Sequence, residues 1–254
     1  MLLRVNMNDY WNGKAAIITG ATHGIGFRLA ERLSAKGVKI ATIYRNNDDQ
    51  ADNLKKIIDN NGGELFIIKG DIIDKNNIKT LIEGTIIKWN RIDFLINNIG
   101  IDIKNEIYNL SEEEWIKAQE IMLNVPFRAI KLCLPVMRKQ KFGRIINMGA
   151  SSKNYMKGQT GLSAFGINKA ALNILTQTLA LEEIKNGITS NMVAPGSTAE
   201  SGVNKEEDRI PISQIPIGRR IDRDEITDGI MFFLSENASS VTGQFLGING
   251  GCSV

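Results

Sequence analysis

Residues that commonly bind metals or form disulfides are scarce in this sequence. It contains one histidine, His23, and two cysteines, Cys133 and Cys252, which lie far apart and form no CxxC pair. A single histidine argues against a histidine-based metal site, and no metal is expected. Two isolated cysteines provide no disulfide framework, which is typical of a reducing compartment, so the expected location is cytoplasmic.

Long apolar runs and tracts of one charge are also missing. Charge or glycine interrupts the apolar runs within about ten residues, whereas a membrane-spanning helix needs ~20. Residues 1–14 lack the apolar block that marks a secretory signal. The net charge of +3 is spread along the chain without runs of lysine or arginine. Neither a membrane nor a nucleic acid is therefore an expected partner.

What the sequence does contain is a regular alternation of short β-branched runs and longer amphipathic segments. Of its 254 residues, 43% are hydrophobic and 23% are charged, which is a globular composition. The first six short runs are mainly apolar, as in parallel strands that helices cover on both faces. The seven predicted strands are Lys14–Thr19, Val38–Tyr44, Glu64–Lys69, Ile92–Ile96, Arg144–Met148, Ile188–Val193 and Phe245–Ile248.

This alternation predicts an α/β protein with a single-domain Rossmann fold, in which a doubly wound, seven-stranded parallel sheet carries helices on both faces. No composition break or repeat marks a second domain. We expect residues 1–12 to form a flexible N-terminal extension and residues 13–254 to form the one domain.

Three helices have clear boundary signals. The segment Ile25–Lys36 is followed by Gly37, which can adopt the left-handed conformation at a helix end. Ser111 and Glu114 form a capping box that begins a helix running toward Lys139. A third helix is predicted from Ser163 to Lys185, ending at Gly187.

A glycine-rich turn connects the first predicted strand to the first helix. A dinucleotide-binding turn needs one glycine to reverse the chain, one to admit a pyrophosphate, and one to pack helix on strand. Gly20, Gly24 and Gly26 fit these roles, although an ordinary strand-to-helix turn would also explain them. We interpret His23 as a loop residue near the adenosine phosphate and not as a catalyst. The residues of this turn predicted to bind cofactor are Gly20, Thr22, His23, Gly24, Ile25 and Gly26.

The end of the second predicted strand bears on cofactor choice. An acidic residue there binds the ribose hydroxyls of NAD, whereas an arginine accommodates the 2′-phosphate of NADP. This chain has Arg45 followed by Asn46. Both are predicted to bind NADP(H), which is the preferred cofactor. A solvated surface arginine is the alternative, so NAD(H) remains open.

Several further motifs, at consistent spacing from residue 14 onward, resemble those of the short-chain dehydrogenase/reductase family. The TGxxxGIG turn is followed by an aspartate after the third strand and by NNIG after the fourth, where the family usually has NNAG. The motifs that carry the resemblance are Asp71, Asn97–Gly100, Leu123–Val125, Pro195-Gly196, Gly243-Gln244 and Asn249–Gly251.

The resemblance implies roles for these residues. Asp71, with the adjacent Ile72, would bind the adenine. Asn98 and Gly100 would line the adenosine ribose, and Ile99 is a modest steric departure from the usual alanine. The residues implied for the nicotinamide end are Pro195, Gly196 and Thr198.

The chain departs from this family at the catalytic tyrosine. The family uses a Tyr-x-x-x-Lys pair, in which the lysine binds the nicotinamide ribose and lowers the pKa of the phenol that transfers the proton. Here the segment reads Phe165 to Lys169, so the lysine is present and the phenol is absent. An ordinary buried helix would also fit these residues. By resemblance, Lys169 and Asn124 would hold a relay water, although Asn124 could instead be a buried residue bonded to backbone.

The position of the family's carbonyl-polarising serine depends on where the count begins. Counting forward along the fifth strand reaches Ala150, whereas counting back from Phe165 reaches Ser152. The strand count is favoured, because a loop tolerates length changes better than a strand, yet Ser151 or Ser152 could still enter the site. Ser152 is retained with Asn124 and Lys169 as a candidate catalytic residue. Tyr155 is a candidate substitute acid.

These residues predict an NADPH-dependent oxidoreductase that reduces a small carbonyl, conjugated alkene or imine. A catalytically retired dinucleotide-binding subunit and an engineered Tyr-to-Phe variant of an ordinary ketoreductase are the alternatives. The polar segment 197–209 corresponds to the family's substrate lid. The family's pairing of two long helices, here about 111–139 and 163–185, implies a homo-oligomer, and a tetramer is expected.

Overall fold

Seven strands form one parallel sheet in the computed structural model, which describes residues 10–150, 160–198 and 211–252. Their order across the sheet is β3-β2-β1-β4-β5-β6-β7, and every neighbouring pair is parallel. The strands are β1 (Ala15–Ile18), β2 (Lys39–Tyr44), β3 (Leu65–Lys69), β4 (Phe94–Asn97), β5 (Gly143–Met148), β6 (Ile188–Pro195) and β7 (Phe245–Ile248).

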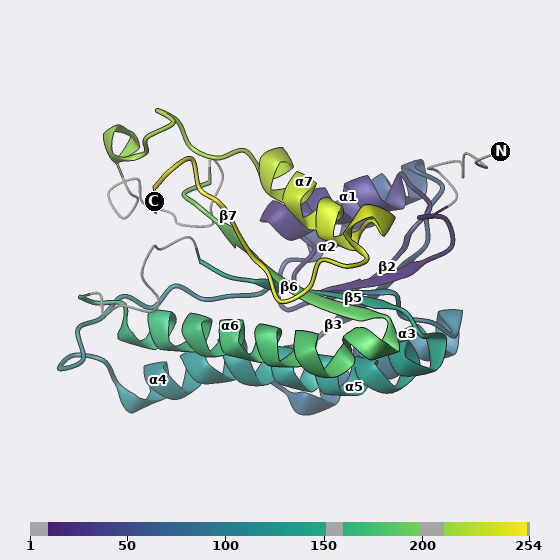
Figure 1. Ribbon diagram of the computed structural model, residues 1–254, viewed down its shortest axis with the longest axis horizontal. Helices are drawn as coiled ribbons and strands as arrows, with labels where there is room; N and C mark the ends of the chain where they lie inside the picture. The colour runs from purple at the N-terminus through teal and green to yellow at the C-terminus, as the bar shows by residue number, and fades with distance from the viewer. Residues whose placement is uncertain (1–9, 151–159, 199–210, 253–254) are drawn as a thin grey trace.

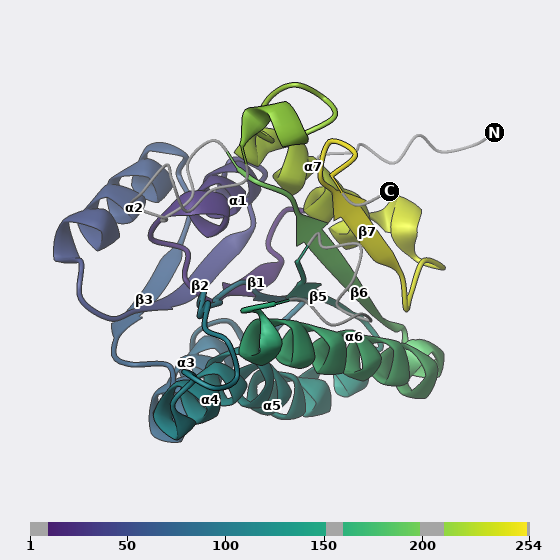
Figure 2. The same ribbon diagram turned by 90° about the vertical axis from the view of Figure 1, so that its left-hand side faces the viewer.

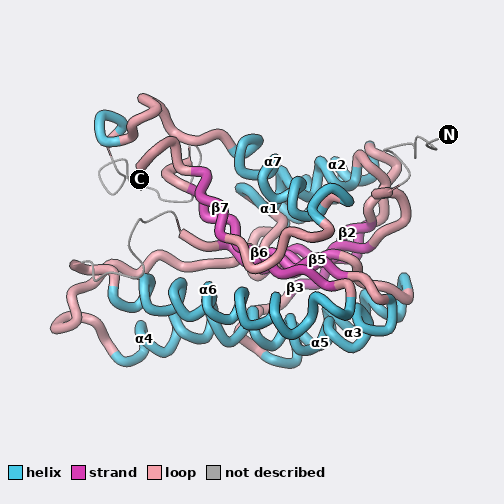
Figure 3. Tube along the Cα trace, viewed as in Figure 1, coloured by secondary structure: helices cyan, strands magenta, loops and turns pink. Residues whose placement is uncertain are grey.

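Helices cover both faces of this sheet. One face carries α1, α2 and α7, and the other carries α3, α4, α5 and α6, as Figures 1 and 2 show from two sides. Figure 3 shows the strands as a single layer between the two helical layers. The helices are α1 (Gly24–Ser34), α2 (Asp48–Asn60), α3 (Lys75–Trp89), α4 (Glu112–Gln119), α5 (Val125–Gln140), α6 (Ser163–Glu183) and α7 (Arg223–Leu234). The predicted doubly wound α/β fold is confirmed.

The central strand shows how the sequence produces two cores. Successive side chains of a strand point to opposite faces of the sheet. Ala16 and Ile18 of β1 join the core beneath α1, α2 and α7, whereas Ala15 and Ile17 join the core beneath α3, α5 and α6. All four are fully buried, and burying an isoleucine side chain contributes about 1.5–3 kcal/mol. An apolar strand without alternation is therefore what this position requires.

The chain direction switches between β1 and β4. From β1 the chain moves outward to β2 and β3, then returns to β4 on the other side of β1. In open parallel sheets, such a switch of direction leaves a crevice at the carboxyl ends of the strands, and ligands bind there. The segments that follow β1 and β4 are the glycine-rich turn and the NNIG motif.

Two predicted helices differ in detail from the structure. The capping box at Ser111 is present, since its hydroxyl accepts from the Glu114 N–H and the Glu114 carboxylate accepts from the Ser111 N–H, both at 3.1 Å. The helix predicted to run from there toward Lys139 is interrupted by a π-helical turn, η1 (Glu120–Asn124), which separates α4 from α5. The third helix ends at Glu183 and continues as a short 3₁₀ turn to Gly187, whose φ is +76°.

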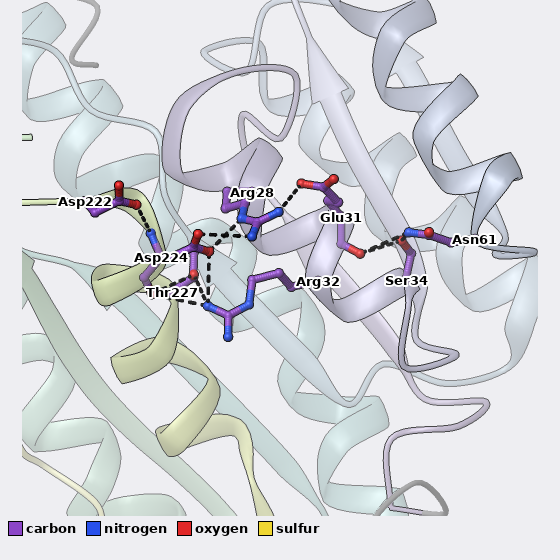
Figure 4. Close-up of polar contacts among 8 residues, drawn as sticks. All are labelled: Arg28, Glu31, Arg32, Ser34, Asn61, Asp222, Asp224 and Thr227. Carbon is purple, nitrogen blue, oxygen red and sulfur yellow. Dashed lines mark hydrogen bonds and ion pairs between the residues drawn. The ribbon is translucent and has the colours of Figure 1, made fainter. Parts of the chain in front are cut away.

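Charged side chains join the two helices at opposite ends of the chain, α1 and α7 (Figure 4). Arg28 donates to Asp224 through Nε (2.6 Å) and Nη2 (3.0 Å), and to Glu31 at 2.7 Å. Arg32 donates to Thr227 at 2.6 Å. These contacts fix α7 beside the helix that follows the glycine-rich turn.

The packed part of the chain begins before the predicted boundary at residue 12. Trp11 is buried in the core beneath α1, and the Tyr10 hydroxyl donates to the Leu234 carbonyl at 2.8 Å. Two aromatic side chains that bury this much apolar surface hold residues 10–12 against the domain. Among the described helices, none is long and apolar enough to cross a membrane.

Candidate functional site

The glycine-rich turn contains backbone conformations that residues other than glycine rarely adopt. Gly20 (φ +70°) and Gly24 (φ +60°) are left-handed, which glycine adopts at little cost. A Cβ at Gly26 would lie 2.4 Å from the Gly20 carbonyl oxygen, so only glycine permits α1 to pack this closely on the turn. Gly20 and Gly24 thus supply left-handed backbone and Gly26 supplies the close helix packing, whereas the pyrophosphate role stays a prediction.

The first turn of α1 is open in a way that suits an anion. A Cβ at Gly24 would have no described atom within 4 Å, and the N-cap residue His23 is exposed and gives the helix no side-chain cap. No acidic residue lies in that turn. The unpaired N–H groups and the helix dipole therefore favour a phosphate there. By contrast, four other helices have side-chain caps, which come from Asn47 (α2), Asp74 (α3), Ser111 (α4) and Asp222 (α7).

Asn98 fixes the turn against β4. Its side-chain amide donates to the carbonyls of Thr19 (2.9 Å) and Gly20 (3.2 Å), while the Thr19 hydroxyl accepts from the backbone N–H groups of Asn98 and Ile99. The structure thus brings Asn98, Ile99 and Gly20 together, and their roles toward the cofactor stay predictions. The amide donors of Asn98 are directed to the turn itself, so this side chain supports the crevice wall.

Arg45 and Asp71 meet at the ends of β2 and β3. The Arg45 guanidinium lies 3.5 Å from the Asp71 carboxylate, and both side chains are about half exposed. Asp71 also accepts from the Ile73 N–H at 3.0 Å, which fixes its orientation. Asn46 is exposed beside Arg45, and Ile72 is buried. An exposed ion pair of this length contributes little to stability, so the arginine is available to a phosphate.

Lys169 is the buried cation of the site. Its Nζ donates to the Met148 carbonyl at the end of β5 at 2.6 Å. The residue as a whole is only 4% exposed. A Cβ at the exposed Gly100 would lie 3.7 Å from that Nζ, so the ammonium lies just below the crevice surface. Burial lowers the pKa of Lys169 to about 8.

A buried polar chain that the sequence analysis missed holds α6 in place. Asn97 donates to Asn147 at 2.8 Å, Asn147 donates to Thr176 at 2.9 Å, and the Thr176 hydroxyl donates to the Leu172 carbonyl. Thr176 lies two helical turns after Lys169 on the same face. A polar Asn147 inside an otherwise apolar strand is the sequence feature that could have indicated this buried polar chain.

The position of the family's tyrosine lies in an apolar environment. Phe165 packs against a cluster that includes Ile121, Met122 and Ala164, and its ring centroid lies 5.8 Å from the Lys169 Nζ. Met122 is fully buried. The sequence analysis missed Met122, whose place in the cluster depends on how the π turn rotates the helix.

Asn124 lies in the same π turn but is bound elsewhere. Its amide donates to Glu120 at 2.8 Å, and Glu120 also accepts from Arg128. These three residues, spaced four apart, form a polar row along their own helix. The Asn124 amide is therefore engaged within its own helix, and its role with Lys169 stays a prediction. π turns occur frequently at functional sites.

Three candidate residues lie outside the described residues. Ser151, Ser152 and Tyr155 fall in the segment 151–159, and nothing can be added to their predicted roles. Ala150, which immediately precedes that segment, is described and half-buried. The strand count therefore places a methyl group where the family has its serine.

The residues predicted for the nicotinamide end lie at the end of β6 and directly after it. The Gly196 N–H donates to the Ile248 carbonyl at 2.9 Å, and a Cβ at Gly196 would lie 2.7 Å from Asn249 Cα. Thr198 is buried and pairs with Ile221. The described residues contain no group of three or more His, Cys, Asp or Glu side chains that could hold a metal ion.

Comparisons with known proteins agree with this geometry. A family model described as Enoyl-(Acyl carrier protein) reductase matches residues 20–253. YtkK of Bacillus subtilis, named as an oxidoreductase, is 35% identical over 94% of this chain and 96% of its own length. The 3-oxoacyl-[acyl-carrier-protein] reductase FabG of Staphylococcus epidermidis is 32% identical over 94% and 98%. A mutant short-chain dehydrogenase/reductase of Serratia marcescens superposes with a TM-score of 0.89 at 25% identity, covering 96% of this chain and all of the other.

Proposed function

The chain belongs to the short-chain dehydrogenase/reductase family, and from that premise we propose that it is an NADPH-dependent reductase of a small carbonyl, conjugated alkene or imine. The observation that carries the proposal is the pairing of an open phosphate site at α1 with the buried Lys169 ammonium in one crevice. The names of the relatives support two of the substrate classes, because one describes reduction of a 3-oxo group and the other of an enoyl group.

The residues present fit a dinucleotide. The open first turn of α1 fits a diphosphate, and the Arg45 guanidinium fits a 2′-phosphate in preference to free ribose hydroxyls. The proposed adenosine-side residues are Gly20, Thr22, His23, Gly24, Ile25, Gly26, Arg45, Asn46, Asp71, Ile72, Asn98, Ile99 and Gly100. The proposed nicotinamide-side residues are Lys169, Pro195, Gly196 and Thr198.

When bound, the nicotinamide supplies a hydride to the substrate. The protein's part is to hold the sugar with Lys169 and to exclude water with the apolar cluster around Phe165 and Met122. Phe165 has no proton to give, so a substrate that generates less charge on oxygen depends less on the missing phenol. Asn124 and Ser152 remain proposed catalytic residues.

A substrate panel tests this function. Purified protein is mixed with NADPH and, separately, with ketones, enones and imines, and loss of nicotinamide absorbance is followed. Turnover of at least one class, with a lower KM for NADPH than for NADH, is expected. Tight NADPH binding with no turnover of any class would contradict the reductase function.

That second outcome would favour a catalytically retired dinucleotide-binding subunit. The specific observation in its favour is that Phe165, Met122 and Ala150 are all apolar where the reaction would occur. Phe165→Tyr tests the third alternative, an engineered variant of an ordinary ketoreductase. Recovery of ketone reduction by this one change would indicate a ketoreductase with a single replaced tyrosine.

We also propose a homotetramer in the cytoplasm. Ile167, Ile174 and Leu181 recur every seven residues along α6 and are 53%, 51% and 81% exposed. Such a row is an apolar strip on one side of a helix. Ile116 of α4 and Phe127 of α5 are also about half exposed. Light scattering of the purified protein should give four times the mass of one chain.

A further inference from the structure

The proposed function requires a proton donor, and the described residues offer one close to Phe165. Reduction of a carbonyl leaves an electron pair on oxygen that must be protonated. The Phe165 ring cannot supply this proton. Lys169 lies 5.8 Å from the ring centroid and carries an ammonium group.

The position of the Lys169 ammonium suits proton transfer. One of its three N–H bonds is directed to the Met148 carbonyl, and its nitrogen lies 3.7 Å from where a methyl group on the exposed Gly100 would be. Loss of a proton leaves an amine with two N–H bonds, so the bond to Met148 persists in either state. The side chain can therefore give up a proton without leaving its place.

The environment makes that proton transferable near neutral pH. Burial lowers the pKa of Lys169 to about 8, and it is the one cause of this shift among the described residues. An acid is most efficient when its pKa lies near the working pH. A lysine at its ordinary value would hold the proton too tightly.

Resting on the proposed reductase function, we propose that Lys169 is itself the general acid of this site, delivering the proton that a phenol supplies elsewhere in the family. As the substrate carbon accepts hydride, the electron pair of its double bond moves to oxygen. The Lys169 N–H bond breaks and an O–H bond forms, leaving a neutral amine. A proton from bulk solvent then restores the ammonium, so the overall reaction consumes one proton, and a bound reduced nicotinamide would supply the hydride as the reductant.

The test compares two arginine variants. Lys169→Arg keeps a cation with N–H donors, but a guanidinium does not give up its proton. We expect the Kd for NADPH, measured by fluorescence, to change less than about 3-fold and kcat to fall at least about 100-fold, a size typical of acid catalysis. The matched control is Lys56→Arg on the exposed face of α2, which should leave both values unchanged.

Two further readouts distinguish an acid from a structural lysine. In the wild type, kcat should fall as the pH rises through one ionisation near pH 8. NMR of isotope-labelled lysine should show a matching titration in the protein without cofactor, and this titration should be absent from Lys169→Arg. Adding Phe165→Tyr to Lys169→Arg should restore kcat at least about 10-fold, because a phenol replaces the lost acid.

The failures are separable. If Lys169→Arg retains kcat and its pH profile, or if Tyr155→Phe abolishes turnover while the NMR titration is unchanged, Lys169 is not the acid although the reductase function stands. If the wild type binds NADPH but reduces no ketone, enone or imine, the proposed function itself fails and the role of Lys169 as acid fails with it.

Discussion

The two ends of the crevice differ in how polar they are. At the end formed by the turn after β1, backbone N–H groups, left-handed glycines and the Asn98 amide make an ordered polar wall. At the end formed by α6 and η1, Phe165 and Met122 belong to one apolar cluster, and the buried Lys169 ammonium lies 5.8 Å from the Phe165 ring centroid. Binding a dinucleotide and transferring a proton are therefore separate requirements: the polar end has the features that the first needs, whereas the apolar end lacks the family's phenol for the second.

Adding a methyl group to the polar end should have the largest effect. Gly24→Ala places a Cβ in the open space beside the α1 N-terminus, where a diphosphate would lie. Loss of about two hydrogen bonds to a charged group, each worth about 1.5–3 kcal/mol, should weaken NADPH at least about 100-fold in a fluorescence titration.

The control for this change is Gly62→Ala. Gly62 has a similar φ of +67° and equally open surroundings but lies after α2. Both variants should lose the same stability, about 1–2 kcal/mol, because each puts alanine in a left-handed conformation. Equal NADPH affinities in the two variants would show that the first turn of α1 does not bind the diphosphate.

Removing the charge beside the second strand should change which cofactor is preferred. Arg45→Ala should weaken NADPH about 10- to 100-fold, the value of a charge-assisted hydrogen bond, while NADH changes less than about 3-fold. Lys69→Ala, which removes an exposed cation from the neighbouring strand β3, is the matched control and should change neither. Equal weakening of NADPH and NADH by Arg45→Ala would contradict the 2′-phosphate assignment.

At the apolar end, removing the buried charge should stabilise the fold. Lys169 has a pKa of about 8 when folded and 10.5 when unfolded, so its buried charge costs most below pH 8. Between these values the unfolded chain binds the extra proton, and the stability of the wild type rises with pH by up to about 3 kcal/mol. Lys169→Met should therefore be about 1–3 kcal/mol more stable than wild type at about pH 7, and this gain should shrink at about pH 10. Urea unfolding measures it, and Lys56→Met should show no such pH dependence.

The smallest effect concerns the contact that joins α1 to α7, away from both ends. Asp224→Ala removes the partner of Arg28 and Arg32. Because the Asp224 side chain is 49% exposed, we expect a loss of only about 0.5–1 kcal/mol by urea unfolding, with no change in NADPH affinity. Asp228→Ala, which removes one more exposed ion pair, should cost less. A change in cofactor affinity with Asp224→Ala would show that this contact shapes the polar end.

The glycine-rich turn of the polar end could be predicted from the sequence because its glycines lie close together in the chain. Gly20, Gly24 and Gly26 lie in one turn, and their roles follow from local backbone geometry. The seven strands were also predictable from their apolar runs, since both faces of the sheet are covered. Strand ends differed by only one or two residues, as for β4, which begins at Phe94 and not at Ile92.

The apolar end depends on contacts between distant segments, which the sequence does not specify. A π turn adds a residue to one turn of the helix, so regular spacing does not predict that Met122 joins the Phe165 cluster or that Asn124 bonds Glu120. The Asn97–Asn147 bond depends on the register between β4 and β5, in which these two residues are direct neighbours. A parallel register across a long connection leaves no local signal.

The most direct measurement is a titration of the purified chain with NADPH, followed by nicotinamide fluorescence, in wild type, Gly24→Ala and Lys169→Met. We expect one saturable site per chain that both substitutions weaken, because the two residues would hold opposite ends of the same molecule. Wild-type protein that saturates with neither NADPH nor NADH would contradict it.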